Sequence, residues 1–204
     1  MKMTEILKVK GDWQEVVDDC RSTVGKDSLG HEPSSEFKRS ILIAEHSPIR
    51  DLSIKWRWTG IKSWIATHWV RHMWECFVKS QRSDRTGIPR DKLPQDALVD
   101  FTGEANCQHL IDTMRKRLCY QASPETRAYA EELKRAIKEV QPELADVLVP
   151  NCVYRGGCPE INECGFYRRL CMQHPTARSR GIRVRYAAYN SEFYGIVKEG
   201  AHGG

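Results

Sequence analysis

The sequence predicts an α+β fold, with strand-forming segments in the first third of the chain and helices after them. Residues 49–58 alternate apolar and polar side chains, with Leu52, Ile54, Trp56 and Trp58 on one face, as in a half-buried strand. From residue 60 onward, apolar residues recur every three or four positions, which is the helical period. The chain has 204 residues, 40% of them hydrophobic and 29% charged, which suits either one globular domain or one domain with a small appendage.

The same patterns and the turn-forming residues predict the other elements. In chain order these are a strand at 3–10, a helix at 12–20, a loop at 25–35, strands at 38–44 and 49–58, a helix at 60–77, a loop at 83–100, and helices at 104–121 and 124–148. The last helix has a defined start, because Ser123 can cap it and Pro124 suits its first position. Pro142 is expected to kink or interrupt it.

Charge and hydropathy limit the classes of function. A net charge of +5 suits phosphate-bearing small ligands, whereas a dedicated nucleic-acid binder has a concentrated basic tract. No apolar run approaches the roughly 20 residues of a membrane-spanning helix. The first ten residues lack the apolar core of a signal peptide. We therefore expect a cytoplasmic protein without a membrane partner, and nucleic acid is a disfavoured partner.

The segment 71–85 says most about function. It opens with Arg71 and His72 at the polar end of an aromatic stretch, and continues to Ser80-Gln81-Arg82. Guanidinium forks together with hydroxyl and amide donors suit a bound phosphate and a heterocycle. The alternative, on charge alone, is a solvated basic face.

This segment resembles the signature of the flavin-dependent thymidylate synthases, Arg-His-Arg followed by a gap and Ser. Here the signature reads Arg71-His72-Met73, so Met73 stands where the family has Arg, and the gap before Ser80 is one residue shorter. Just upstream, residues 66–72 read Ala-Thr-His-Trp-Val-Arg-His and resemble the family's Ala-Arg-Gln-Trp-x-Arg-His, with His68 in place of Gln.

A second stretch, residues 105–127, resembles the family's C-terminal motif without a gap. The matching positions are Asn106, Arg117, Ala122, Glu125 and Arg127, whereas Gln108 replaces an Arg and Asp112 replaces an Asn. The resemblance spans about residues 40–150 in the family's order. It implies a curved antiparallel sheet with packed helices, assembled as a homotetramer with active sites between subunits. We divide the chain into a flavin-dependent thymidylate synthase-like domain at 1–150 and a Cys-rich, basic C-terminal extension at 151–204.

The resemblance also implies a reaction and a set of site residues. The reaction is the reductive methylation of dUMP at C5, with FAD as cofactor and with methylenetetrahydrofolate and NADPH as co-substrates. Arg117 occupies the position that stabilises negative charge on the pyrimidine edge, and is the catalytic candidate. Its alternative is an exposed helix cation, since Arg115 and Lys116 flank it. The expected nucleotide-binding residues are His68, Arg71, Ser80, Gln81, Arg82, Arg90 and Arg117. The expected flavin-binding residues are Ser47, Arg71, His72, Met73, Asn106, Gln108 and Asp112.

The extension contributes four of the eight cysteines, Cys152, Cys158, Cys164 and Cys171. Turns at Gly156-Gly157 and Pro159 allow four thiolates to converge, and a structural zinc takes four such ligands. The spacing lacks a Cys-x-x-Cys knuckle, so reduced buried thiols or a disulfide remain open beside a metal site.

Two other functions stay open. One is a flavin enzyme that acts on another pyrimidine nucleotide, with dCMP as substrate or a hydroxymethyl product. The other is a zinc-stabilised nucleic-acid-binding module that uses the basic tail.

Overall fold

A computed structural model describes residues 3–195. The fold is α+β, as predicted, and is built on one antiparallel sheet with the strand order β1-β2-β4-β3. The strands are β1 (Thr4–Lys10), β2 (Ser53–Lys62), β3 (Glu75–Val78) and β4 (Leu98–Asn106). The helices, in chain order, are α1 (Trp13–Ser22), α2 (Ser35–Ala44), η1 (Ser47–Asp51), α3 (Ser63–Trp69), α4 (Ser83–Thr86), η2 (Arg90–Lys92), α5 (Cys107–Arg117), α6 (Pro124–Val140), α7 (Pro142–Val147), α8 (Asn151–Arg155), α9 (Phe166–Gln173), α10 (Thr176–Ser179) and α11 (Ile182–Gly195).

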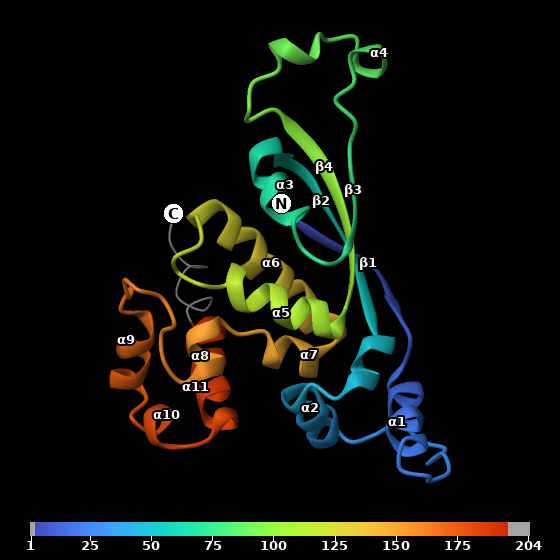
Figure 1. Cartoon of the computed structure of the whole chain (residues 1–204), viewed down its shortest axis with the longest axis vertical. Helices are drawn as coiled ribbons and strands as arrows, with labels where there is room; N and C mark the ends of the chain where they lie inside the picture. Colours follow the sequence, from blue (N-terminus) through green and yellow to red (C-terminus); the bar gives the residue numbers. More distant parts are fainter. Residues whose placement is uncertain (1–2, 196–204) are drawn as a thin grey trace.

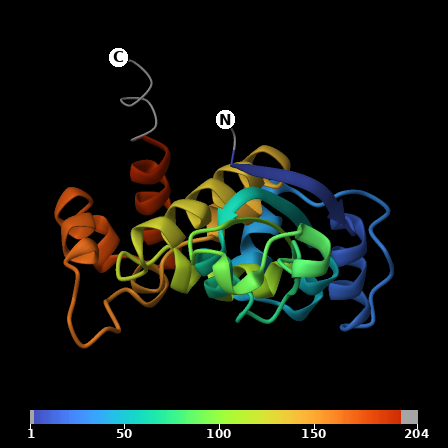
Figure 2. The ribbon, with the colours of Figure 1, turned by 90° about the horizontal axis from the view of Figure 1, so that it is seen from above.

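Helices α5 and α6 lie beside the sheet, and α8 to α11 lie on their far side, away from the strands (Figures 1 and 2). At the opposite end, the chain from β3 through α4 and η2 to β4 forms an arm that projects from the sheet (Figure 1). We call residues 79–97 the arm. The arm carries Ser80, Gln81, Arg82 and Arg90, and it projects away from α5.

The strands form because their apolar side chains alternate and meet the helices on one face. Ile54, Trp56 and Trp58 of β2 are fully buried. The ladder between β2 and β4 shifts its register between Trp58 and Ile61. Gly60 lies inside this shift with φ +70°, a backbone conformation that glycine adopts at no steric cost.

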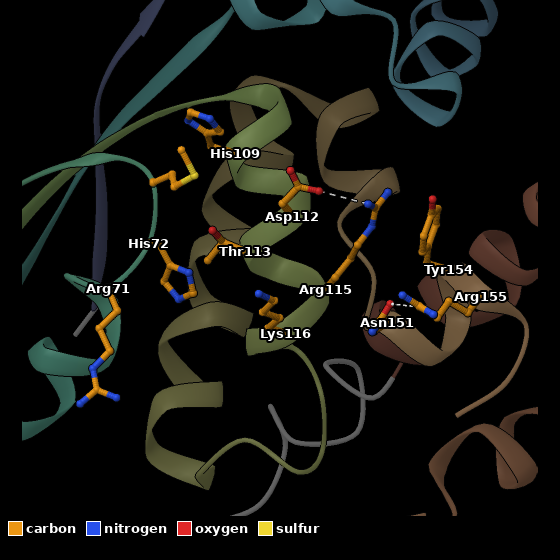
Figure 3. Close-up of a pocket in the computed structure, with 11 residues that line it drawn as sticks. Arg71, His72, His109, Asp112, Thr113, Arg115, Lys116, Asn151, Tyr154 and Arg155 are labelled. Carbon is orange, nitrogen blue, oxygen red and sulfur yellow. Dashed lines mark hydrogen bonds and ion pairs between the residues drawn. The ribbon is translucent and has the colours of Figure 1, made fainter. Parts of the chain in front are cut away.

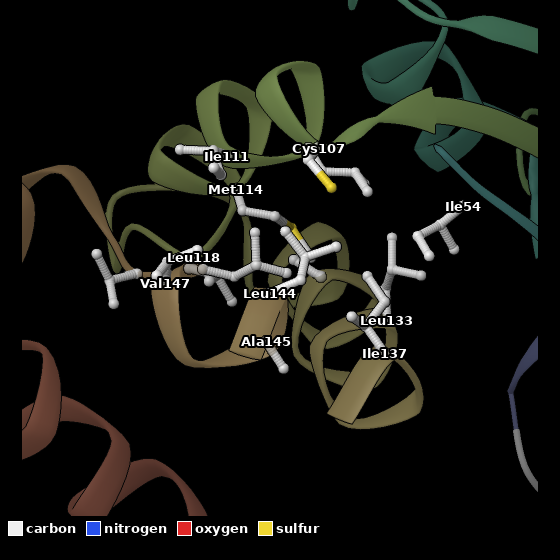
Figure 4. Close-up of a cluster of buried hydrophobic side chains, with 14 of the residues drawn as sticks. Ile54, Cys107, Ile111, Met114, Leu118, Leu133, Ile137, Leu144, Ala145 and Val147 are labelled. Carbon is white, nitrogen blue, oxygen red and sulfur yellow. The ribbon is translucent and has the colours of Figure 1, made fainter. Parts of the chain in front are cut away.

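The core between α5, α6 and α7 is aliphatic (Figure 4). Met114 and Leu118 from α5 and its end, Leu133 and Ile137 from α6, and Leu144 from α7 are all buried. Burial of each such side chain stabilises the fold by roughly 1.5–3 kcal/mol. Side chains of α8, α9 and α11 belong to the same buried cluster, so the C-terminal part packs onto the rest of the protein through apolar contacts.

Lys134 of α6 ties the C-terminal helix to this core. Its Nζ donates to the carbonyl oxygens of Ala145 at 2.6 Å and Leu148 at 2.8 Å, and to Oδ1 of Asn190 on α11 at 2.8 Å. Burial lowers the pKa of Lys134. Three acceptors nevertheless require three N–H groups, which only the ammonium form has.

Three predictions about secondary structure were wrong. Residues 38–44 belong to helix α2, whose start is capped by Ser34; its hydroxyl accepts from the backbone N–H of Phe37 at 3.3 Å. The predicted helix at 60–77 shrinks to α3, because 53–62 continue as strand β2 and 75–78 form strand β3. A loop was predicted up to residue 100 and a helix from residue 104, but strand β4 occupies Leu98–Asn106.

Other predictions were confirmed. The strand at the N-terminus and the short helix after it appear as β1 and α1. Ser123 caps α6 with Pro124 at its first position, and the helix stops at Val140, before Pro142 begins α7.

Candidate functional site

Arg117 lies at the last position of α5 and is held from two sides by the segment that follows β2. Its Nε donates to Nε2 of His72 at 2.8 Å, and its Nη2 donates to the carbonyl oxygen of His68 at 2.7 Å. Its guanidinium lies 5.9 Å from the centre of the Trp69 ring. Arg117 is half-buried, whereas the neighbouring Lys116 is exposed. Arg117 is therefore a positioned cation and not a freely solvated one.

The imidazole of His72 is neutral. Burial, together with the positive charges of Arg117 and Lys116, lowers the pKa of His72 to about 4. Because Nε2 accepts a hydrogen bond from Arg117, the ring proton lies on Nδ1. A neutral acceptor in this place orients the guanidinium without adding a second charge.

His68 is also fixed by a buried hydroxyl. Its Nδ1 lies 2.7 Å from Oγ1 of Thr126, which in turn accepts from Oγ of Ser123 at 2.8 Å. Burial lowers the pKa of His68, and the charge of Arg117 lowers it further. The cap of α6 and the residue expected to touch the nucleotide are therefore one hydrogen-bonded unit.

A cavity of about 440 Å³ opens between α5, the 71–73 turn and α8 (Figure 3). This volume lies within the roughly 300–1,000 Å³ of small-molecule sites. The lining includes the cations Arg71, Arg115, Lys116 and Arg155, against one carboxylate, Asp112. A second cavity of about 440 Å³ shares Met73 and His109 with the first and extends along β4 past Asn106. The two cavities are thus adjacent, but only the first is basic, because the second is lined by the carboxylates of Glu75 and Glu104 and by no Lys or Arg.

Five of the expected flavin-binding residues line these cavities: Arg71, His72, Met73 and Asp112 in the first, with Met73 and Asn106 in the second. Asn106 has a structural role as well, since its Oδ1 caps α5 by accepting from the backbone N–H of His109 at 2.9 Å. Ser47, at the start of η1, is exposed.

Gln108 and Asp112 are engaged by neighbouring side chains. Nε2 of Gln108 donates to Oε2 of Glu45 at 2.7 Å, and Nη1 of Arg115 donates to Oδ1 of Asp112 at 3.1 Å. Arg115 also forms an ion pair with Glu45, and its guanidinium stacks on the ring of Tyr154 at 3.6 Å. Two residues predicted to contact flavin thus belong to a network that joins α5, the end of α2 and α8.

Four of the expected nucleotide-binding residues, Ser80, Gln81, Arg82 and Arg90, lie on the arm, which projects away from α5 (Figure 1). Arg82 forms a two-point ion pair with Asp84, at 3.0 and 2.9 Å, on an exposed turn. Ser80 accepts from the backbone N–H of Arg82 at 3.3 Å, and Arg90 is exposed. Gln81 lines a separate cavity of about 470 Å³ between α3 and the arm.

The structure does not support the expected metal site at Cys152, Cys158, Cys164 and Cys171. Among residues 3–195, no three His, Cys, Asp or Glu side chains are grouped so that they would hold a metal ion. All eight cysteines are free thiols. Burial raises the pKa of the Cys152 thiol to about 12. The alternative of a zinc-stabilised nucleic-acid-binding module loses its premise.

Sequence reasoning missed Asn151, Tyr154 and Arg155, which line the first cavity from α8. They lie just beyond the stretch that resembles the family, and the sequence assigned no helix there. The run Asn-Cys-Val-Tyr-Arg-Gly-Gly was informative, because a polar residue, an Arg four positions later and a following Gly are typical of a short capped helix.

Comparisons with known proteins agree with the fold. The model of the family described as thymidylate synthase complementing protein matches residues 88–143. The resemblance to this family is confirmed. The matched stretch runs from the arm through β4 and α5 into α6, and so includes Arg117. It covers only part of the chain. A comparison with curated protein sequences gives no match.

Among solved structures, the chain is similar to a UMP/dUMP methylase, PolB from Streptomyces cacaoi, bound with 5-Br dUMP. The TM-score is 0.57 at 15% sequence identity, over 71% of this chain and 93% of that one. At this identity the likeness establishes the fold. In residues 3–195 no helix is both long and apolar enough to cross a membrane.

Proposed function

We propose that this protein is a flavin-dependent enzyme that alkylates a pyrimidine nucleotide at C5, with dUMP as substrate and thymidylate as product. The observation that carries the proposal is the placement of Arg117, a half-buried guanidinium fixed by His72 and the His68 carbonyl beside a basic cavity. Similarity to the thymidylate synthase complementing protein family and to a UMP/dUMP methylase supports the same reading.

The role of Arg117 follows from the chemistry of uracil. C5 becomes nucleophilic only as negative charge develops on the ring, and a preorganised guanidinium stabilises that charge at the pyrimidine edge. The two hydrogen bonds use Nε and one N–H of Nη2, and among the described residues Nη1 donates no hydrogen bond. Nη1 and the remaining N–H of Nη2 form a planar fork that suits two ring acceptors.

The fit of FAD rests on the cavities lined by Arg71, His72 and Met73. The first cavity offers cations for a diphosphate and ring faces for a heterocycle, and the adjoining second cavity, which has no Lys or Arg, extends the space beyond about 440 Å³. When bound, FAD supplies a hydride, taken in our proposal from NADPH. Methylenetetrahydrofolate supplies the carbon at the methylene level, and the C5 proton of the nucleotide is lost. The chain itself binds the phosphates, orients the pyrimidine edge and holds its charge.

The arm fits this proposal if the enzyme is an oligomer. Ser80, Gln81, Arg82 and Arg90 are expected to bind the nucleotide phosphate, but within one chain the arm that carries them projects away from α5 (Figure 1). A site between subunits, as the family resemblance implies, would bring the arm of one copy to α5 of another. We therefore propose a homotetramer in which each site is completed by a neighbouring copy.

The direct test is product identification. The purified protein is incubated with dUMP or dCMP, methylenetetrahydrofolate, FAD and NADPH, and the nucleotide is analysed by mass spectrometry. Addition of one methyl group to dUMP supports thymidylate synthesis, whereas a hydroxymethyl adduct or selective use of dCMP would replace it by the related pyrimidine reaction. Unchanged nucleotides, together with protein that neither carries flavin nor binds added FAD, would refute the flavoenzyme.

A further inference from the structure

Three cations of the first cavity have no carboxylate partner. Arg71 from the 71–73 turn, Lys116 from α5 and Arg155 from α8 line its wall (Figure 3). None of them forms an ion pair with a carboxylate of residues 3–195, whereas Arg115 is paired with Glu45 and Asp112. Like charges gathered in a cavity repel one another, and a bound anion relieves that repulsion. The arrangement is therefore that of an anion site that needs its ligand.

Helix α8 is short, yet it is held in place from two sides. The guanidinium of Arg185 on α11 donates to the carbonyl oxygens of Val153 and Tyr154, both at 2.9 Å. The ring of Tyr154 packs against the guanidinium of Arg115 at 3.6 Å, and Val153 is fully buried. These contacts fix the backbone that presents Arg155 to the cavity.

The guanidinium of Arg155 is itself oriented for a ligand. Its Nε donates to Oδ1 of Asn151, one helical turn earlier, at 3.1 Å. Arg155 is exposed, and its terminal nitrogens donate no hydrogen bond to residues 3–195, so they can make a two-point contact, the geometry in which Arg binds phosphate oxygens. Asn151 and Arg155 project from α8 toward the cavity, and Lys116 projects from α5 between them and His72 (Figure 3).

Met73 stands where a cation would be expected beside the cofactor. The family signature has an Arg at this position, and its loss removes one charge beside the cofactor. The Met73 side chain is 79% exposed and lines both cavities, so it faces the region that Lys116 and Arg155 also face.

We propose that Arg155 and Lys116 bind the diphosphate of the flavin cofactor and replace the cation missing at Met73. The inference rests on the proposed function, since it assumes that FAD binds in this cavity. It assigns a cofactor-binding role to helix α8, which lies outside the segment that resembles the family. The C-terminal part is then a component of the active site and does more than extend the fold.

The test compares flavins that differ in phosphate content. Dissociation constants for FAD and for riboflavin, which has no phosphate, are measured on the full chain by flavin fluorescence. The variants are Arg155→Gln, Lys116→Gln, and Arg168→Gln as an exposed control on α9. Losing one charge-assisted hydrogen bond weakens binding by about tenfold or more. We expect that loss for FAD in the first two variants, an unchanged riboflavin constant, and no change in the control.

A rescue experiment separates a direct contact from a structural effect. Adding Met73→Arg to the Arg155→Gln variant places a cation back at the family position and is expected to restore most of the FAD affinity. Wild-type FAD affinity in Arg155→Gln and Lys116→Gln would overturn the inference and leave the proposed function intact. Equal losses for FAD and riboflavin would also overturn it. Wild-type protein that binds no FAD would remove the proposed function, and the inference with it.

Discussion

Arg117 donates a hydrogen bond from Nε to Nε2 of His72 over 2.8 Å, and this contact joins two segments that lie 45 residues apart in the sequence. One segment is the turn after α3, and the other is the end of α5. The neutral ring and the charged guanidinium form a pair in which each constrains the other.

The first prediction concerns acid stability. In the folded protein the pKa of His72 is about 4, below the ordinary histidine value of 6.5, so the unfolded chain binds the proton first as the pH falls. The stability that neutral His72 contributes is present above pH 6.5 and is lost as the pH falls toward 4. His72→Gln keeps an acceptor for Arg117 but does not titrate. Its free energy of unfolding should fall less over this window, by on the order of 2 kcal/mol after discounting for partial exposure.

The measurement is urea unfolding of wild type and His72→Gln at several pH values between 4 and 7. His31→Gln makes the same change in an exposed loop and serves as the control. Parallel pH profiles for wild type and His72→Gln would contradict a buried neutral imidazole.

The second prediction concerns the sheet. Gly103 of β4 lies under the ring of Trp56, and a Cβ there would be 2.4 Å from Cζ2 of that ring. Trp56 cannot move aside easily, because Trp58 and Trp74 contact it at 5.7 and 5.0 Å between ring centres. Gly103→Ala should lower the free energy of unfolding by roughly 1–3 kcal/mol. Gly181→Ala, where a Cβ meets nothing within 4 Å, is the control in the same urea titration. Equal stability of the two variants would mean that the strands pack less closely.

The third prediction concerns the attachment of α11. Lys134→Met leaves the carbonyls of Ala145 and Leu148 and the amide oxygen of Asn190 without their hydrogen-bond donor. Each unsatisfied acceptor costs about 1–3 kcal/mol. We expect a loss of about 3 kcal/mol or more in unfolding free energy and faster amide exchange in α11. Lys8→Met, on the exposed side of β1, is the control. A variant as stable as wild type, with unchanged exchange, would show that Lys134 does not hold the C-terminal helix.

The sequence predicted elements where one local signal dominates. The cap at Ser123, the break at Pro142 and the alternation of Leu52 to Trp58 each act within a few residues, and all three were confirmed. The strand prediction for residues 38–44 was wrong because Ile41, Leu42 and Ile43 are apolar in succession, and such a short run fits a strand or a buried helix equally well. The helix expected at 60–77 failed because tertiary pairing with β4 outweighs the helical spacing of Met73 and Phe77.

The site was predictable only where a motif marked it. Two short motifs predicted Arg117, His72 and Arg71 as site residues, and the structure places these residues near one another at one end of α5, while their roles stay predictions. The sequence did not predict that Arg155 and Lys116 line the cavity, because a basic side chain on a helix is usually a solvated one. The cavity they line depends on Arg185, which holds α8 through the carbonyl oxygen of Val153. These two residues are 32 positions apart in the sequence, so no local pattern reveals the contact.

The most direct test of the account is Arg117→Lys, measured in both half-reactions on one preparation. Lysine keeps the charge but loses the planar fork that matches two pyrimidine atoms, and losing one preorganised donor typically costs on the order of 10²–10³ in rate. We expect nucleotide alkylation to fall by that factor, while flavin content and flavin reduction by NADPH stay near wild type. Arg168→Lys, exposed on α9, should leave both unchanged. Equal losses in both half-reactions would make Arg117 structural, and near-normal product formation would contradict its placement at the pyrimidine.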